Sequence, residues 1–316
     1  MRRMGGQGAD GVVFPRSRRW ITNAKGQRIP IGSASARPIP GAQPTGPPAS
    51  ASTQPSVPAR RGFHPASDDE RKTAKVPPAW TDVQFADDPS AALLAVGRDS
   101  KGRTTRLYSA EHSGRQSEQK FTRLKAFDAD HDRMAGRIRQ DAEKGSEEAC
   151  VLYLIDQTGF RVGSDRETGA KEKAFGASTL TADQAKVDGN RVAFDFTGKK
   201  GVHIQKTVED PLLARIISGH SKGHGRLFAT SDGKVRDYLH SIDGKFKVKD
   251  FRTWQGTQKA LETLVGMTPP RDDKEAAKQR REVGKVVSEH LGNTPAVALA
   301  SYIAPSVFAV WEEGLR

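Results

Sequence analysis

Residues 191–205 read RVAFDFTGKKGVHIQ, and this stretch decides the fold of the region that surrounds it. Apolar residues alternate with polar or small ones on both sides of a central GKKG turn, which is the period of strands with one buried face. A tight glycine-containing turn between two such runs is typical of a hairpin. The pattern therefore predicts a β-hairpin over residues 186–208, with Lys199 and Lys200 at its tip.

The hairpin interrupts a region that is otherwise patterned as helices, from about residue 126 onward. A helix that is charged at its start and apolar at its end is predicted over residues 133–156. Asp210 followed by Pro211 is typical of a helix start directly after the hairpin, with Gly219 at the end of that helix. Further helices are predicted over residues 234–242, 250–265, 271–291 and 295–303, with Asp250 and Thr294 as N-caps and Gly292 as a terminator.

Two regions with other compositions precede the helical one. Residues 1–66 hold ten of the eighteen prolines and ten basic residues against one acid. A segment of this composition cannot bury a core, so we predict a disordered Pro/Arg-rich tail. Residues 67–125 contain the β-like pieces WTDVQFA, ALLAVGRD and RLYS between turn signals. We therefore expect an α+β protein: a small, mostly-β N-terminal domain over 67–125, then a mainly α-helical domain with a β-hairpin over 126–316.

The overall charge indicates the kind of partner. The 316 residues carry a formal net charge of +13, which favours a polyanion, and nucleic acid before a membrane surface. Cys150 is the only cysteine, which excludes a disulfide framework and a cysteine zinc cluster and predicts a reducing, cytoplasmic setting. No apolar run approaches the length of a membrane span, and the N-terminus lacks the apolar core of a secretory signal.

Short patterns that resemble cofactor sites do not fit their context. GQGADG at 6–11 follows no strand, and DADHDR at 128–133 lacks the glycine of a calcium loop. His220 and His224 lie beside glycines that disfavour a shared helix, and no Gly-Lys-Ser/Thr phosphate loop occurs in the sequence. We therefore expect no metal, no nucleotide and no other cofactor.

Three basic residues stand in unusual local settings. Arg161 lies in the glycine-flanked stretch TGFRVGS, Lys199 on the hairpin turn, and Arg252 near a helix start in KDFRTWQGT at 249–257. A guanidinium held by bulky apolar neighbours suits a phosphate that must be met in a set orientation. Each residue alone is more often an ordinary surface charge, so the sequence around all of them has to be weighed together.

Four motifs occur in the order and spacing found in the type IB DNA topoisomerases, in the poxvirus-like form that bacteria carry. They are TGFRVGS, FTGKKGV, KDFRTWQGT and LGNTPAVALASY. VPPAWTDV at 76–83 and GRDSKGRTTRLYS at 97–109 resemble the N-terminal DNA-clamping domain of that family. The resemblance covers about residues 70–310 and implies a catalytic domain like that of the tyrosine recombinases.

The resemblance implies a mechanism and a set of catalytic residues. Tyr302 would attack a phosphodiester of double-stranded DNA and form a 3′-phosphotyrosyl link, while Arg161 and Arg252 brace the phosphate oxygens. Lys199 would donate a proton to the leaving 5′-oxygen. Asn293 stands where poxvirus and eukaryotic members carry histidine, a change that bacterial relatives share, and its amide can donate the same hydrogen bond without charge. The implied activity is relaxation of supercoiled DNA by a monomer, without ATP or metal.

The resemblance also implies contacts to DNA outside the catalytic set. The family usually presents two tyrosines after the KGR turn for the major groove, and this sequence keeps the second as Tyr108 and has Arg106 at the first. The remaining candidates for DNA binding are Arg103 in that turn, Lys200 beside the hairpin lysine and Lys249, three residues before Arg252.

Two alternatives stay open at this level. A tyrosine recombinase or integrase would use the same Arg, Lys, Arg and Tyr chemistry, but with a helical core-binding domain in place of the β-rich one. A non-catalytic DNA-binding module would use the same basic residues only to neutralise phosphates. The second alternative predicts salt-dependent binding with no covalent adduct, unaffected by Tyr302→Phe.

Overall fold

The computed structural model describes residues 20–22, 28–30, 60–100, 102–165, 173–221 and 225–313. Most of the predicted tail, residues 1–66, lies outside this part of the chain. Within the tail, β1 (Trp20–Thr22) and β2 (Arg28–Pro30) pair antiparallel. The expected α+β class is confirmed by an antiparallel sheet near the N-terminus, followed by a mostly helical region with a second sheet.

The N-terminal lobe is an antiparallel sheet whose strands lie in chain order. The strands are β3 (Phe63–Pro65), β4 (Thr81–Ala86), β5 (Leu93–Arg98) and β6 (Thr104–Tyr108). The short helix α1 (Asp68–Thr73) lies between β3 and β4 in the chain. Three predicted strands are confirmed as β4, β5 and β6. The sheet begins at Phe63, before the predicted boundary at residue 66. Helix α1 was not expected, although Ser67 and Glu70 form a capping box that its sequence displays.

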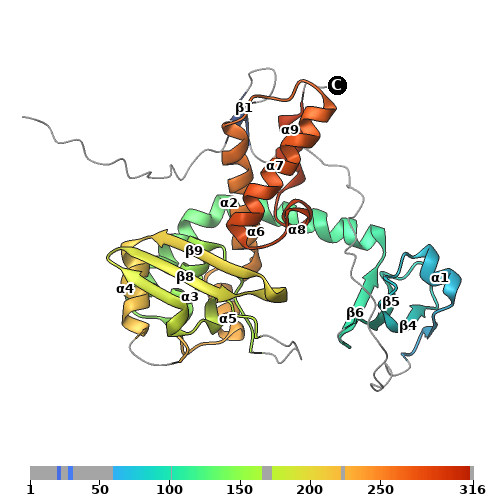
Figure 1. Cartoon of the computed structure of the whole chain (residues 1–316), viewed down its shortest axis with the longest axis horizontal. Coiled ribbons are helices and arrows are strands. Elements are labelled where there is room, and N and C mark those ends of the chain that lie inside the picture. The colour runs from blue at the N-terminus through green and yellow to red at the C-terminus, as the bar shows by residue number, and fades with distance from the viewer. Residues whose placement is uncertain are drawn as a thin grey trace, which may run out of the picture.

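A single helix of 34 residues, α2 (Ala110–Glu143), leads from this lobe into the rest of the molecule (Figure 1). The predicted domain boundary at residue 125 lies inside it. The expectation of one helix over 133–156 is wrong, because the chain turns at Gly145, whose φ is +87°. Ser146 then caps α3 (Glu147–Thr158) by accepting from the backbone N–H of Ala149.

The predicted hairpin is confirmed and belongs to a slightly larger sheet. The order is β7 (Ala185–Asp188), β8 (Arg191–Thr197) and β9 (His203–Glu209), all antiparallel. A 3₁₀ turn at Lys199–Gly201 joins β8 to β9. The buried face of β8 packs on the core. Helix α4 (Pro211–His220) begins after Asp210, as expected, and ends one residue beyond Gly219. Figure 1 shows α3 and α4 beside this sheet.

The remaining helices are α5 (Asp232–Ile242), α6 (Val248–Val265), α7 (Asp273–Leu291), α8 (Pro295–Ser301) and α9 (Pro305–Trp311). Thr294 caps α8 and Gly292 ends α7 in the left-handed conformation, as predicted. Asp250 is not the N-cap of α6, because the helix begins earlier, after Lys247. The Asp250 carboxylate instead accepts from the Lys247 N–H at 2.9 Å.

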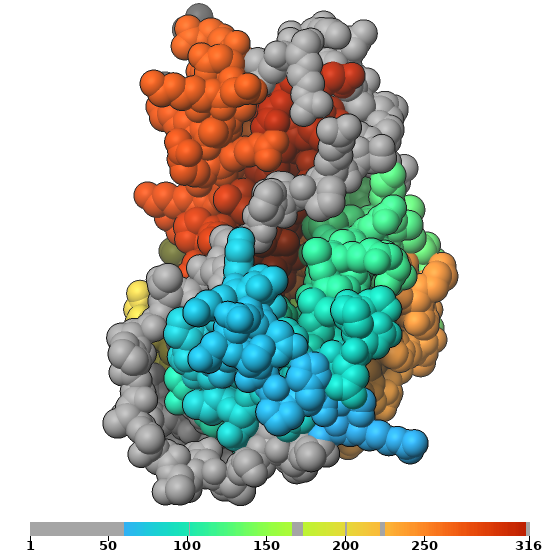
Figure 2. Space-filling view, turned by 90° about the vertical axis from the view of Figure 1, so that its right-hand side faces the viewer, coloured from blue at the N-terminus to red at the C-terminus, as the bar shows by residue number. Residues whose placement is uncertain are grey.

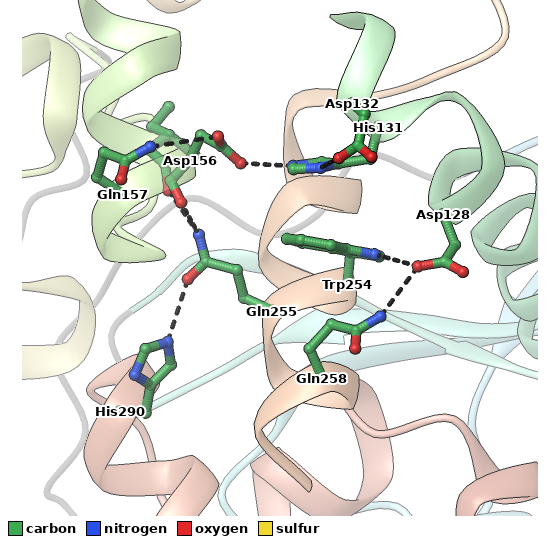
Figure 3. A network of polar contacts seen from close by, with 10 residues as sticks. Asp128, His131, Asp132, Asp156, Gln157, Trp254, Gln255, Gln258 and His290 are labelled. Atoms are coloured by element: carbon green, nitrogen blue, oxygen red, sulfur yellow. Dashed lines mark hydrogen bonds and ion pairs between the residues drawn. The ribbon is translucent and has the colours of Figure 1, made fainter. Parts of the chain in front are cut away.

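Polar contacts fix α2 against α6 across the domain interior. Asp250, only 2% exposed, accepts from Arg123 at 2.7 and 3.0 Å. Farther along, Asp128 accepts from the indole N–H of Trp254 at 2.7 Å, and His131 stacks on the same indole with ring centres 3.7 Å apart (Figure 3). Trp254 packs against both large apolar clusters, so α6 lies where the two halves of the helical region meet.

Figure 2 views the molecule from the side of the N-terminal lobe, which lies nearest the viewer. Val76, Val83, Phe85 and Ala95 form the separate small core of this lobe. Of the helices that the structure describes, none is both long enough and apolar enough to cross a membrane.

Candidate active site

Arg252 is 3% exposed and is held by the ends of two helices. Its Nη1 donates to the carbonyl of Gly159, which ends α3 in the left-handed conformation, and its Nη2 donates to the carbonyl of Leu291 at 2.5 Å. The last carbonyls of a helix have no partner within the helix, so a buried cation is well placed there. The Nε of Arg252 has no hydrogen-bond partner among the described residues.

Tyr302 lies directly over this guanidinium. The Cζ of Arg252 is 5.0 Å from the centre of the Tyr302 ring. Tyr302 ends α8, and its backbone carbonyl accepts from the hydroxyl of Thr257 at 3.2 Å. A Cβ added to Gly256 would lie 2.6 Å from that same carbonyl oxygen. Helix α6 therefore carries the arginine and, one turn later, the surface on which the tyrosine segment rests.

Arg161 and Asn293 approach the site from the segments that follow α3 and α7. Nη1 of Arg161 lies 3.5 Å from the carbonyl of Gly292, the residue before Asn293. The Asn293 side chain has both amide atoms buried, and neither finds a hydrogen-bond partner in the described part of the chain. Buried polar atoms without partners are rare in native proteins, and a catalytic or binding role is one of their causes.

The charges of the site act on the phenol. Burial by itself raises the pKa of Tyr302, but the charges and hydrogen bonds of Arg252 and Arg161 prevail and hold that pKa below its ordinary value. Burial, with repulsion from Arg161, lowers the pKa of Arg252 to about 10. Two cations packed on one phenol are stabilised by a negative oxygen between them, either a phenolate or a phosphate.

The hairpin turn lies beside these residues. Ile204 of β9 would meet a Cβ placed on Gly198, at the foot of the turn, and also one placed on Gly292. Lys199 is exposed on that turn, and the side chain of Lys200 lies outside the described residues. Lys249 is exposed on the first turn of α6. Among the predicted catalytic residues, Lys199 is therefore the exposed one. The side chain of Ile204 lies between the residue before it, Gly198, and Gly292.

The DNA-binding candidates of the N-terminal lobe do not join this site. Arg106 and Tyr108 lie two apart on the exposed face of β6, and Tyr108 stacks on His112 with ring centres 5.2 Å apart. Arg103 is paired with Asp99, at 2.8 Å from its Nε and 2.5 Å from its Nη2. These side chains form a separate exposed surface, and the long helix α2 leads from it toward the rest of the molecule.

Three residues near the site were not among those predicted from the sequence. Gly256, inside the quoted stretch KDFRTWQGT, is a glycine in a helix interior, which is a signal of close packing. Lys206 occupies an inward position of β9 between Ile204 and Val208, where the strand period requires an apolar residue. Lys120 of α2 donates to the carbonyl of Ser301 at 3.1 Å, a contact between distant segments with no local signal in the sequence.

No cluster of three or more metal-ligating side chains occurs within the described segments. The chemistry that the geometry supports is that of an oxygen nucleophile beside two guanidiniums and a buried amide. Such a set suits a phosphate bearing charge on its non-bridging oxygens.

The comparisons with known proteins agree with this geometry. A family model for the eukaryotic DNA topoisomerase I catalytic core matches residues 109–304. The chain is 26% identical over 254 residues to DNA topoisomerase 1B of Acanthamoeba polyphaga mimivirus, which covers 72% of this chain and 75% of that protein. It is 28% identical over 115 residues to DNA topoisomerase 1 beta of Arabidopsis thaliana and 24% identical over 144 residues to DNA topoisomerase 1 of Caenorhabditis elegans. Those two matches cover 34% and 40% of this chain but only 12% and 18% of the relatives.

The range matched by the family model includes every candidate catalytic residue from Arg161 to Tyr302. The N-terminal lobe is a β-sheet, whereas the recombinase alternative requires a helical domain at that place. The chain therefore belongs to the DNA topoisomerase I family and is a type IB DNA topoisomerase of the poxvirus-like kind.

Proposed function

We propose that this protein relaxes supercoiled duplex DNA through a transient single-strand break in which Tyr302 is joined to a 3′-phosphate. The observation that carries the proposal is the placement of the Tyr302 ring 5.0 Å from the guanidinium of Arg252. The Nε of Arg252 and the amide of Asn293 add support, because both are N–H donors without a partner among the described residues.

The proposed cleavage step conserves the energy of the broken bond. The phenol oxygen of Tyr302 bonds to phosphorus, the bond from phosphorus to the 5′-oxygen breaks, and the phenol proton passes to solvent. The leaving 5′-oxygen takes a proton from Lys199, which gives a free 5′-hydroxyl. One phosphoester replaces another, so the reverse attack reseals the strand after it has swivelled, and no ATP is required.

Charge stabilisation in this proposal comes from the protein alone. As the pentacoordinate phosphate develops, Arg252, Arg161 and the Asn293 amide are the donors that face its non-bridging oxygens. Donors that are already in place need no rearrangement during the reaction, and they commonly supply the largest part of the rate enhancement. We therefore propose a reaction that needs no metal ion.

DNA binding is proposed to use both lobes of one chain. Arg103, Arg106 and Tyr108 would grip the duplex from the N-terminal lobe, and Lys200 and Lys249 would contact phosphates next to the active site. Contacts of this kind give most of the affinity and little of the sequence preference. We propose that the protein acts as a monomer.

The proposal is tested by relaxation of a negatively supercoiled plasmid in EDTA and without ATP. We expect the wild type to relax the plasmid and to form a covalent protein–DNA adduct. This adduct should remain intact when the protein is denatured. Tyr302→Phe should bind the plasmid with similar affinity but give neither product. If Tyr302→Phe still relaxes the DNA, or if the wild type requires ATP or a metal ion, the proposed mechanism is wrong.

A further inference from the structure

Lys206 is a partly buried lysine that the reaction just proposed does not use. It lies on β9, and its Nζ donates to the carbonyl of Thr158 at 2.6 Å and to the carbonyl of His290 at 3.1 Å. The Nδ1 of the same histidine is 3.5 Å away. Burial and the charge of Arg252 lower the pKa of Lys206 to about 7. Either protonation state keeps enough N–H groups for both carbonyls.

The carbonyls bound by Lys206 immediately precede those bound by Arg252. Lys206 takes Thr158 and His290, while Arg252 takes the next residue of each segment, Gly159 and Leu291. Two basic side chains thus join the end of α3 to the end of α7 through neighbouring carbonyls. The last carbonyls of a helix have no partner within the helix, so the N–H groups of both side chains find acceptors there.

The segments that leave these two helix ends carry the rest of the site. Arg161 follows Gly159 by two residues, and Asn293 follows Leu291 by two. The distance between the ends of α3 and α7 therefore sets the positions of Arg252, Arg161 and Asn293 together. A change of about 1 Å in such an arrangement can cost two orders of magnitude in rate.

A second set of hydrogen bonds, made by Gln255, also joins the end of α3 to the end of α7. Gln255 donates to the carbonyls of Ile155 and Asp156 near the end of α3, and its Oε1 lies 3.1 Å from the Nε2 of His290 (Figure 3). Burial and the nearby cations, Lys206 first among them, lower the pKa of His290 to about 3, so the ring is neutral. A neutral ring that donates from Nε2 presents Nδ1 as an acceptor toward Lys206.

We propose that Lys206 is a positioning residue of the cleavage reaction, which joins the ends of α3 and α7 so that Arg252 is held beneath Tyr302. The inference rests on the proposed function, because it assigns Lys206 a part in that reaction. The hydrogen bonds of Lys206 go to the carbonyls of Thr158 and His290 and not to Tyr302. Its effect on the rate passes through Arg252.

The test measures the first-order rate constant of covalent adduct formation at saturating protein, together with DNA affinity. Lys206→Met removes the N–H donors of the amine and keeps a side chain of similar length. Lys186→Met, on the exposed face of β7 in the same sheet, is the matched control. We expect the rate constant of Lys206→Met to fall by about 10- to 100-fold, with little change in affinity, while Lys186→Met matches the wild type.

A double-mutant cycle separates positioning from a general loss of structure. If Lys206 acts through Arg252, then Lys206→Met combined with Arg252→Ala is no slower than Arg252→Ala alone. Combined with Lys199→Ala, a residue with another role, the same change should multiply the two losses. If Lys206→Met does not accumulate as folded protein, Lys206→Gln replaces it in every arm, because its amide still donates to one carbonyl.

The outcomes distinguish this inference from the mechanism it rests on. A wild type that forms no Tyr302-dependent adduct overturns the proposed function and the inference with it. A wild type that forms the adduct, while Lys206→Met either keeps the wild-type rate or multiplies its loss with that of Arg252→Ala, overturns the positioning role alone. Full non-additivity with Arg252→Ala supports it.

Discussion

Arg252 and Tyr302, fifty residues apart in the sequence, face each other with the guanidinium carbon 5.0 Å from the ring centre. One helix, α6, sets both positions, since it carries Arg252 and, through Thr257, binds the backbone of Tyr302. The electrostatic and steric properties of this pair lead to measurable expectations.

The first prediction concerns the ionisation of Tyr302. Burial raises its pKa, but the charges of Arg252 and Arg161 lower it by more, so the phenol should ionise below the ordinary value of about 10. Arg161→Ala should move the titration to higher pH. Ultraviolet titration of each protein, with its Tyr302→Phe counterpart subtracted, measures the midpoint. Equal midpoints with and without Arg161 would contradict this account.

The same shift has a consequence for stability. The folded-state pKa of Tyr302 lies below the unfolded-state value, so the unfolded protein holds the proton over that interval and the folded protein does not. Stability from this group should therefore rise with pH through the folded-state pKa, and be absent at lower pH. Chemical denaturation of the wild type and Tyr302→Phe across this pH range measures the difference.

The second prediction concerns the two arginines. Arg161→Ala and Arg252→Ala should each lose about 3–4 kcal/mol of transition-state stabilisation, because each removes a preorganised donor to the developing charge. DNA affinity should change far less. Arg236→Ala, an exposed arginine of α5 paired with its neighbour Asp237, serves as the control and should cleave at the wild-type rate. Parallel losses of affinity and rate would assign the arginines to binding.

The third prediction concerns Gly256. Because Gly256 has no Cβ, the Tyr302 carbonyl can approach the helix closely. A Cβ at this position would lie 2.6 Å from the carbonyl oxygen of Tyr302. Gly256→Ala should displace the tyrosine and abolish adduct formation, even though alanine favours the helix. Gly136→Ala in α2, where nothing lies within 4 Å of the added atom, should stabilise the protein by about 0.5–1 kcal/mol without loss of activity. An active Gly256→Ala would show that the segment can shift harmlessly.

The fourth prediction concerns Lys199. If it gives a proton to the 5′-oxygen, Lys199→Ala should slow cleavage of ordinary DNA strongly. In a substrate with sulfur in place of that oxygen, the 5′-thiolate can leave without a proton. Such a substrate should restore the rate of Lys199→Ala toward that of the wild type. Failure of the sulfur substrate to restore the rate would remove Lys199 from the role of general acid.

The fifth prediction concerns the ion pair between α2 and α6. Asp250 is 2% exposed and receives two hydrogen bonds from Arg123, so Asp250→Ala should lower the free energy of unfolding by about 3–5 kcal/mol. The exposed pair of Glu111 and Arg115 on α2 gives the contrast, and Glu111→Ala should cost less than about 1 kcal/mol. Equal effects in thermal or urea unfolding would contradict the importance of burial.

Local patterns were sufficient where neighbours along the chain determine structure. The alternation around GKKG predicted the hairpin, and Thr294 and Gly292 marked helix ends correctly, because caps and strand periods depend on adjacent residues. The break at Gly145 was missed because apolar residues continue beyond it, and the start of α6 was placed late because Asp250 caps from inside the helix.

The sequence by itself determined the α+β class, the hairpin and, through four motifs in order, the family and its candidate residues. Only the tertiary structure decided which of them meet. Arg252 is held by carbonyls from residues 159 and 291, and Tyr302 rests on Gly256, contacts that join segments far apart along the chain. Such contacts depend on how helix ends pack in three dimensions, which no local period records. The strand period marks Lys206 as a lysine at an inward position, but only the folded protein shows that it joins residues 158 and 290.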